Sequence, residues 1–339
     1  RVLMITGDHP QTAAAIAKDV GLGKGQPVVI SAEADPEKFE AAWLKANPEF
    51  LRSADVIARC NPIQKLRVVE ALKSSGEIVA VTGDGVNDVP AIKAADIGIA
   101  MGVRGSRSAK EVSSIILSDD NFSTIVNAIR EGRQLFSNLR LSFEYLLLFH
   151  IPFVLSAALV PLLGYPLLFL PAHVVWLELI IHPTALFAFQ QVAKSENDGA
   201  PEQRVSFFDK RDALRVLLVG LAVATAVIIS FVTGLSENSD ANHGRAKIMA
   251  LLPLWSAGLA VFLTKGKSRT ANIIAAASLL FSALLIQSKW LAEPLHLTPL
   301  HGLDWFKVSG TVVAAIAMLL LLQRRFSSMQ RPKDGSNAC

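Results

Sequence analysis

The stretch "IVAVTGDGVND", residues 78–88, places a polar, glycine-rich turn directly after an apolar run. The run has the composition of a buried strand, and Gly83-Asp84-Gly85 follows it at once. In an open parallel sheet, ligands bind beyond the carboxyl ends of the strands, where this turn should lie. Glycines let the backbone turn sharply and come close to a ligand. The stretch therefore predicts a ligand site at one edge of an α/β sheet.

The same turn carries two carboxylates at helical spacing. Asp88 lies four residues beyond Asp84, with Asn87 between them. Two carboxylates one helical turn apart are suited to a hard cation such as Mg²⁺, which favours oxygen ligands and retains waters for a phosphate. A plainer alternative is that the aspartates only cap a helix. The spacing indicates a Mg²⁺ site, with capping as the alternative.

A second turn of the same kind lies near the start of the chain. "ITGDHPQTA", residues 5–13, again gives an apolar strand, then Thr6-Gly7-Asp8, then a helix. Thr6 and the backbone amides after it could receive a phosphate oxygen at a helix N-terminus, although an N-cap and a turn explain the pattern equally well. Lys65 lies on a predicted helix between the two turns, where a lysine beside Mg²⁺ would neutralise phosphoryl charge. Most helical lysines are merely solvated, so Lys65 is a candidate only because of the two turns.

Strand-like and helix-like patterns alternate over the first part of the chain. The strand-like runs are residues 2–6, 54–59, 77–82, 97–101 and 113–117. Helical patterns cover 10–22 and 62–76, and residues 31–53 are predicted to be a helical connection. Such alternation predicts an α/β fold with a parallel sheet covered by helices on both faces. A long helix is predicted from about Asn121 onward into a membrane.

Apolar runs of bilayer length follow one another in the rest of the chain. They are residues 141–163, 168–190, 213–235, 247–264, 271–288 and 304–323. Glu178 and His182 interrupt the second run. The sequence therefore predicts an all-α region of six transmembrane helices and a lipid bilayer as a partner.

Basic residues set the predicted orientation of these spans. They gather in loops of one parity and after the last span: Lys194, Arg204, Lys210, Arg211, Arg215, Lys265, Lys267, Arg269, Arg324, Arg325, Arg331 and Lys333. The bias predicts that the α/β part and the C-terminus are cytoplasmic. With a net charge of +4 and basic residues that flank apolar blocks, a nucleic-acid partner is not expected. Two cysteines, Cys60 and Cys339, imply no disulfide framework.

Three stretches together resemble a known family. "RVLMITGDHPQTAAAIAKDVGL", "ARCNPIQKLRVVEALKSSGEIVAVTGDGVNDVPAIKAADIGIAMG" and "DDNFSTIVNAIREGRQLFSNLR" closely resemble the phosphorylation domain of P-type cation-transporting ATPases. With the predicted spans, the resemblance covers almost the whole chain in the same order, and the calcium-pump-like branch is nearest. The family couples ATP hydrolysis to ion transport through a phosphorylated aspartate, on a haloacid-dehalogenase-like (Rossmann-like) fold.

The resemblance implies roles for residues of both turns. Asp84 would coordinate Mg²⁺, with Asn87 and Asp88 completing the site, and Lys65 would contact the phosphorylated aspartate. Phosphate and the phosphate end of ATP would be bound by the cofactor-binding residues Thr6, Gly7, Asp8, Thr82 and Gly83. Mg²⁺ is the implied cofactor and ATP the implied substrate.

The family's Asp-Lys-Thr-Gly-Thr motif, which carries the phosphorylated aspartate, does not occur in this sequence. Its nucleotide-binding domain, actuator loop and first four spans have no counterpart here either. The chain opens "RVLMITGD", without an initiator Met, and is expected to be a C-terminal fragment that is inactive alone. The expected parts are the end of the phosphorylation domain (1–125), a stalk (126–140), six spans (141–323) and a cytoplasmic tail (324–339). The expected location is the plasma membrane.

Polar residues within the spans mark a candidate cation pathway. His150 precedes Pro152, and Glu178 and His182 lie at i,i+4 on one helical face. The calcium-pump branch has Asn and Asp where this sequence has Glu178 and His182. Imidazole suits transition metals, and His with Glu also suits a proton path, so a transition metal, a proton and Ca²⁺ all stay open. Alternatively, His150 or His173 could only bridge helices by hydrogen bonds.

Two other functional hypotheses stay open. One is a phosphatase domain fused to a passive membrane anchor, although no strand here offers a suitable nucleophilic Asp turn. The other is a truncated, catalytically inactive remnant or a membrane-anchored regulatory partner of a complete pump.

Overall fold

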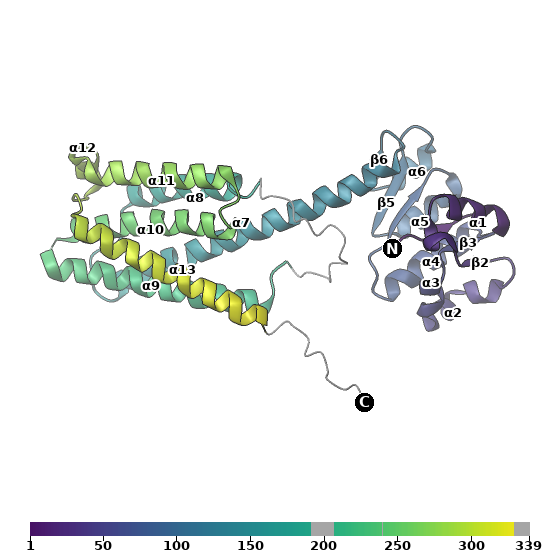
Figure 1. Ribbon diagram of the computed structural model, residues 1–339, viewed down its shortest axis with the longest axis horizontal. Coiled ribbons are helices and arrows are strands. Elements are labelled where there is room, and N and C mark those ends of the chain that lie inside the picture. The colour runs from purple at the N-terminus through teal and green to yellow at the C-terminus, as the bar shows by residue number, and fades with distance from the viewer. Residues whose placement is uncertain (191–206, 239, 329–339) are drawn as a thin grey trace, which may run out of the picture. The chain divides into compact units, whose positions relative to one another are not determined.

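The computed structural model describes residues 1–190, 207–238 and 240–328. It divides into two compact units, Arg1–Ile129 and Arg130–Cys339. Helix α7 (Phe122–Leu162) begins in the first unit and continues through the second (Figure 1). Four basic residues used for the predicted orientation lie outside the described residues: Lys194, Arg204, Arg331 and Lys333. Cys339 and the end of the predicted tail also lie outside them.

The strands of the first unit form two parallel sheets of three strands each. One has the order β1 (Met4–Ile5), β3 (Val56–Ala58), β2 (Val29–Ser31). The other has the order β4 (Ala80–Gly83), β5 (Ile97–Met101), β6 (Ile115–Leu117). The parallel arrangement is confirmed, but the prediction of one continuous sheet is wrong. Among the described strands, β1 pairs only with β3 and β4 only with β5, so both are edge strands.

Helices connect and cover these strands. They are α1 (Pro10–Asp19), α2 (Ala41–Ala46), α3 (Pro48–Ser53), α4 (Pro62–Ser74), α5 (Val89–Ala94) and α6 (Arg107–Val112), with short 3₁₀ turns at Leu22–Gly25, Pro36–Phe39 and Val86–Asp88. The region 31–53 is largely helical as predicted, although β2, which ends at Ser31, was not predicted.

Local sequence explains where α4 lies. Asn61 and Gln64 form a capping box, and Pro62 occupies the first turn, where its missing N–H costs nothing. The buried Val68 and Ala71 of α4 pack in the same apolar cluster as Ile57 of β3. These contacts fix the first turn of α4, which carries Lys65.

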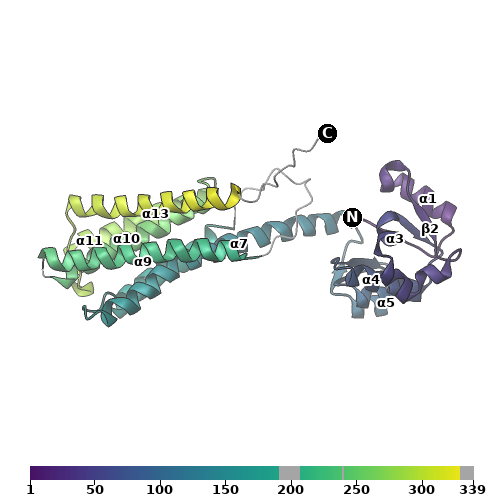
Figure 2. The ribbon, with the colours of Figure 1, turned by 90° about the horizontal axis from the view of Figure 1, so that it is seen from below.

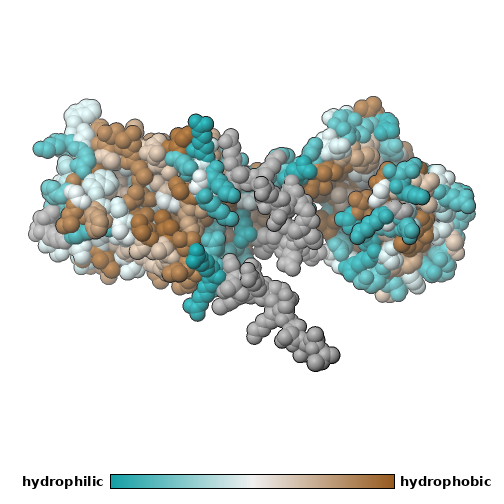
Figure 3. Space-filling view, in the orientation of Figure 1, coloured by the Kyte–Doolittle hydropathy of each residue, from teal (hydrophilic) through white to brown (hydrophobic). Residues whose placement is uncertain are grey.

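The second unit is a helical bundle. Besides the rest of α7, it contains α8 (Pro171–Phe187), α9 (Lys210–Asn238), α10 (Ala241–Leu263), α11 (Arg269–Gln287), α12 (Lys289–Ala292), a 3₁₀ turn η4 (Glu293–Leu295) and α13 (Gly302–Ser328). Helices α9, α11 and α13 all pack against α10, most of whose residues are buried (Figures 1 and 2). The outer face displayed in Figure 3 is mainly hydrophobic over these helices.

Five described helices are long and apolar enough to cross a membrane: α7, α9, α10, α11 and α13. They account for five of the six predicted spans. The remaining predicted span, 168–190, is replaced by α8, which has only 17 residues. At 1.5 Å per residue α8 is about 26 Å long, less than the ~30 Å hydrocarbon core of a bilayer. The region is therefore multi-pass by length and composition, with α8 shorter than predicted.

Candidate functional site

The turn after β4 brings two site residues of the first unit close together. A Cβ atom added to Gly83 would lie 2.6 Å from the Cβ atom of Asp88, closer than real side chains approach. The absence of a side chain at Gly83 is therefore what allows Asp88 to fold back over the end of β4. Thr82, by contrast, lies within β4 opposite Ile99 and is exposed.

Lys65 and Asp88 form an ion pair across this turn. Lys65 Nζ lies 2.7 Å from Asp88 Oδ1, and each side chain is 17% exposed. Asp88 Oδ2 also accepts a hydrogen bond from the Gly85 N–H, at 3.3 Å. The carboxylate thus does the local capping that the plainer alternative proposed, and it also binds a lysine from another element.

The exposed Asp84 and Asn87 lie in the same turn. The backbone carbonyl of Asp84 accepts a hydrogen bond from the Ser106 N–H at 2.7 Å, which holds the turn against the start of α6. No three His, Cys, Asp or Glu side chains of the described residues are arranged to hold a metal ion. Mg²⁺ commonly uses only one or two carboxylates and keeps its waters, so Asp84 and Asp88 are a suitable donor set for it.

The first turn, Thr6-Gly7-Asp8, is held by its own side chains. The Thr6 hydroxyl donates to Asp8 Oδ2 at 2.8 Å and accepts from the Asp8 N–H at 3.1 Å. His9, not Thr6, caps α1 through its side chain. Within the part of the chain that the structure describes, no hydrogen bond or ion pair joins this turn to the Lys65–Asp88 pair.

Arg59 is a neighbour of the first turn that the sequence did not reveal. Its N–H donates to the Asp8 carbonyl at 3.1 Å, and the Cys60 N–H donates to the Thr6 carbonyl at 3.0 Å. Arg59 has a left-handed backbone (φ 52°), and its side chain, 45% exposed, lies with Nε 3.5 Å from Glu33 Oε2. The only available signal was its position directly after a predicted strand. Burial raises the pKa of the Cys60 thiol to about 11, partly opposed by the Lys65 charge, which leaves the thiol protonated and a poor nucleophile.

The predicted cation-pathway residues also come together, in the second unit. Glu178 lies between two imidazoles: His182 Nε2 is 2.7 Å from Oε2, and His150 Nε2 is 3.6 Å from Oε1. The contact to His182 is short but lacks hydrogen-bond geometry, so the buried Oε2 atom has no hydrogen-bond partner. His150 Nδ1 lies 2.9 Å from the Leu146 carbonyl, which can only accept, so Nδ1 carries a hydrogen. In the neutral ring, Nε2 of His150 therefore presents a lone pair to the carboxylate.

His173 does not join this cluster. Its Nε2 atom lies 2.6 Å from the Leu295 carbonyl, and its Nδ1 atom accepts from the Leu170 N–H at 3.2 Å. The hydrogen-bonding alternative is thus the arrangement found for His173.

Further ionic groups of the bundle were not predicted as sites. Arg140 and Arg215 bind Asp212, and Arg215 also binds Glu144 at 2.6 Å. Near the other end of the bundle, Lys247 lies 3.2 Å and His243 3.6 Å from the carboxylate of Asp304. In the sequence, a charge within an apolar run was the only signal for them.

Comparison with known proteins agrees with both units. The model for the C-terminus of cation-transporting ATPases matches residues 166–325, and the model for haloacid dehalogenase-like hydrolases matches residues 1–96.

Similar proteins include a calcium-transporting ATPase of Bacillus subtilis (strain 168), 33% identical over 336 residues, which are 95% of this chain and 37% of that protein. Calcium-transporting ATPase 4, endoplasmic reticulum-type, of Arabidopsis thaliana is 35% identical over 242 residues, 70% of this chain and 23% of the relative. The cation-transporting ATPase pma1 of Synechocystis sp. is 42% identical over 228 residues, 65% of this chain and 24% of the relative. The chain thus spans little more than a third of the length of these relatives, or less. Since the two family models match in order and one similarity extends over nearly every residue, the chain belongs to the P-type cation-transporting ATPases, on the calcium-pump-like side of the family.

Proposed function

We propose that the chain is the part of an ATP-driven cation pump that joins Mg²⁺-dependent phosphoryl chemistry to a membrane pathway. The observation that supports this most directly is the Lys65–Asp88 ion pair beside Asp84, at the carboxyl end of β4. This edge is where open α/β sheets bind ligands. The lysine provides a positive charge for phosphoryl oxygens, and the two carboxylates provide negative charge for a metal ion.

In this proposal Asp84 and Asp88 hold Mg²⁺, and Asn87 supports the site. Bound Mg²⁺ would neutralise charge on a phosphoryl group. Lys65 contributes a second positive charge from α4. In the turn Thr6-Gly7-Asp8, the Gly7 N–H is the amide proposed for a phosphate oxygen of ATP, since the Thr6 N–H donates to Ile57 and the Asp8 N–H to Thr6. Thr82 and Gly83 shape the end of β4 so that the phosphoryl group can come close.

The nucleophilic aspartate would come from a segment outside this sequence. The edge strand β1 is followed by the turn Thr6-Gly7-Asp8, and the edge strand β4 ends within the turn Thr82-Gly83-Asp84. A parallel strand placed between them would pair with both and unite the two sheets. Its carboxyl end would then lie beside Thr6-Gly7-Asp8 and Asp84, where the family's phosphorylated aspartate is needed.

The proposed cation pathway passes Glu178, with His150 and His182 as its neighbours. The names of two relatives describe calcium transport. Calcium takes six to eight oxygen ligands, whereas this cluster offers one carboxylate and two imidazoles. The cation is therefore left as a class in this proposal, with Ca²⁺, transition metals and the proton as its members. The α/β unit and the C-terminus are proposed to be cytoplasmic, in a plasma-membrane protein.

The first experiment tests the phosphoryl chemistry in the complete pump protein that contains this chain. Asp84→Asn should reduce Mg²⁺-dependent formation of the phosphoenzyme from ATP by at least about a hundredfold, because it removes a metal ligand. Asp96→Asn is the matched control, since Asp96 binds Lys73 elsewhere on the surface. Equal phosphoenzyme levels in the Asp84→Asn variant and the wild type would contradict the proposal.

A second experiment tests the pathway. His182→Ala should abolish the stimulation of phosphoenzyme formation by the transported cation, measured over Ca²⁺, Mn²⁺, Zn²⁺, Na⁺ and pH. His296→Ala, which changes an exposed histidine of a loop, should leave stimulation unchanged. If stimulation by every member of the series survives in His182→Ala, His182 has no role in the pathway.

A further inference from the structure

His173 makes two hydrogen bonds that only one protonation state of its ring allows. The residue is fully buried. Its Nδ1 atom accepts from the Leu170 N–H, so Nδ1 carries a lone pair. Its Nε2 atom faces the Leu295 carbonyl at 2.6 Å and must donate to it. A neutral ring with its hydrogen on Nε2 meets both demands, whereas the imidazolium ion has a hydrogen on each nitrogen and no acceptor.

The two bonds join segments that are far apart in the chain. Leu170 is the residue before α8, and Leu295 ends η4 in the segment that connects α11 to α13. We call residues 288–301 the end loop. Besides Leu295, the end loop is held by Gln287, whose side chain donates to the Leu300 carbonyl at 2.9 Å. His173 thus joins the start of α8 to η4 by a side-chain hydrogen bond.

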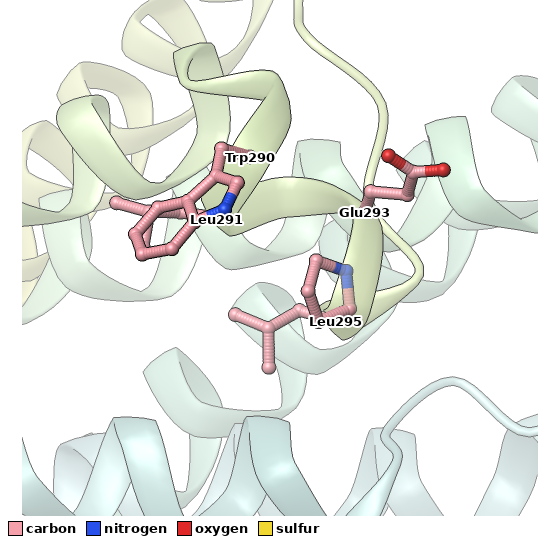
Figure 4. Close-up of a pocket in the computed structure, with 5 residues that line it drawn as sticks. Trp290, Leu291, Glu293 and Leu295 are labelled. Atoms are coloured by element: carbon pink, nitrogen blue, oxygen red, sulfur yellow. The ribbon is translucent and has the colours of Figure 1, made fainter.

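The end loop carries an exposed apolar surface. A shallow cavity of about 550 Å³ is lined by Trp290, Leu291, Glu293, Pro294 and Leu295 (Figure 4). Trp290 is 82% exposed. Because Leu295 contributes both to this cavity and to the bond with His173, loss of that bond would free one wall of the cavity.

Other charged or titratable groups lie around His173. Arg245 of α10 and His296 of the end loop are the groups whose charge acts on it directly. The Arg245 guanidinium donates two hydrogen bonds to the Leu167 carbonyl, at 3.0 and 3.1 Å, in the loop that leads to Leu170. Among the described residues, the neighbouring elements also carry Tyr165, His243, Lys247, Lys289, Glu293, His301 and Asp304, and the Asp304 carboxylate lies near both His243 and Lys247.

We propose that His173 is a proton-operated clasp: the neutral ring ties the end loop to the start of α8, and protonation of Nδ1 releases it. A proton on Nδ1 would point at the Leu170 N–H, so one bond is replaced by a contact between two donors. Restoring acceptable contacts requires the ring to leave Leu170, Leu295 or both. The regulated element is the end loop with its apolar surface, and the regulating ligand is a proton from the side of the membrane that this end of the bundle faces. The proposal does not depend on which cation, if any, is transported.

The test is hydrogen exchange of the full chain in lipid nanodiscs between pH 8 and pH 5, read by mass spectrometry on peptides from residues 165–175 and 288–301. Exchange is expressed as protection factors, so the intrinsic pH dependence cancels. In the wild type, protection of both peptides should fall by about tenfold or more at pH 5, the order expected for one or two lost hydrogen bonds. Peptides from α10 should keep their protection.

Three variants separate the clasp from general acid sensitivity. His173→Gln keeps a neutral donor and a neutral acceptor, so its protection should be the same at both pH values. His173→Leu has neither a donor nor an acceptor, so the protection of both peptides should be low even at pH 8. His296→Gln removes the exposed histidine nearby and should behave as the wild type does. Protection of the wild type that does not change with pH, or a His173→Gln variant that loses protection as the wild type does, would overturn the proposal, and this second result does not require the Leu variant to fold.

Discussion

Replacing Lys65 with Met should weaken the first unit and at the same time strengthen its binding of Mg²⁺. The Lys65–Asp88 pair is 2.7 Å long, with each side chain 17% exposed. An exposed pair contributes up to ~1 kcal/mol, and breaking a fully buried one costs about 3–5 kcal/mol. A pair with this exposure should fall between these limits, near 2 kcal/mol. The equilibrium constant for local opening of the surrounding segment would then rise about 30-fold.

The effect on Mg²⁺ has the opposite sign. In the absence of a metal ion, the Lys65 ammonium neutralises Asp88, and it repels a cation approaching Asp84 and Asp88. Without it, the two carboxylates are free to attract Mg²⁺, and we expect affinity to rise about tenfold, or ~1.4 kcal/mol, which is well within the Coulomb energy of charges a few ångströms apart near a protein surface. The phosphoryl chemistry would nevertheless be lost, because Lys65 is proposed to neutralise the phosphoryl group.

Both effects can be measured on the full chain in nanodiscs. Hydrogen exchange of α4 and β4 amides gives the local stability, and titration calorimetry gives the Mg²⁺ affinity. The matched control is Lys73→Met on the same helix, since Lys73 lies 3.2 Å from Asp96, with both side chains more than a third exposed. The Lys73→Met variant should lose less than ~1 kcal/mol of local stability, and its Mg²⁺ affinity should be unchanged. Equal changes of Mg²⁺ affinity in both variants would refute the reasoning, as would a Lys65→Met variant that binds Mg²⁺ more weakly than the wild type.

Three other predictions follow from particular contacts. Gly83→Ala forces its Cβ atom against Asp88, so we expect a loss of about 1–3 kcal/mol in calorimetric or denaturant unfolding and weaker Mg²⁺ binding. Arg215→Met leaves Glu144 buried without its partner and should cost about 3–5 kcal/mol, whereas adding Glu144→Leu should restore most of the loss in thermal unfolding. Backbone hydrogen bonds lower the pKa of Asp120, so its stabilisation is present above the pKa of the unfolded chain, near 4, and lost as pH falls further; Asp120→Asn should flatten this acid limb of a stability–pH curve.

Local sequence signals predicted the first unit well where a strand or helix depends on its own residues. Pro62 begins α4 as predicted, after the Asn61–Gln64 capping box, and β5 has the predicted bounds because Ile97–Met101 is a continuous apolar run. The pairing of strands was harder to predict. Strands β1 and β4 each carry the right pattern, but a pattern does not reveal which strands pair, and β1 pairs with β3 whereas β4 pairs with β5. The single predicted sheet is therefore two sheets.

The candidate site shows the same limit. Asp84, Asp88 and Lys65 could be named because glycines and carboxylates at short spacing follow a strand. Arg59 could not, since its contact with the first turn is a backbone hydrogen bond to Asp8 that forms only when β3 lies beside β1. Likewise the apolar run 168–190 does not reveal that α8 begins only at Pro171 and ends at Phe187. The helix is therefore shorter than predicted.

The charges within the bundle separate structural groups from the candidate pathway. Glu144 is neutralised by Arg215, and Asp304 by Lys247, so each carboxylate has a partner whose positive charge is permanent at neutral pH. Glu178 differs, because its recorded partners are two imidazoles, and its Oε2 atom is buried without a hydrogen bond. A carboxylate in an apolar bundle must be neutralised, and at Glu178 a proton on the carboxyl group or on an imidazole, or a bound cation, can do this. Of these carboxylates, Glu178 is therefore the one whose neutralisation can change with the state of the protein, which is what a transport site requires.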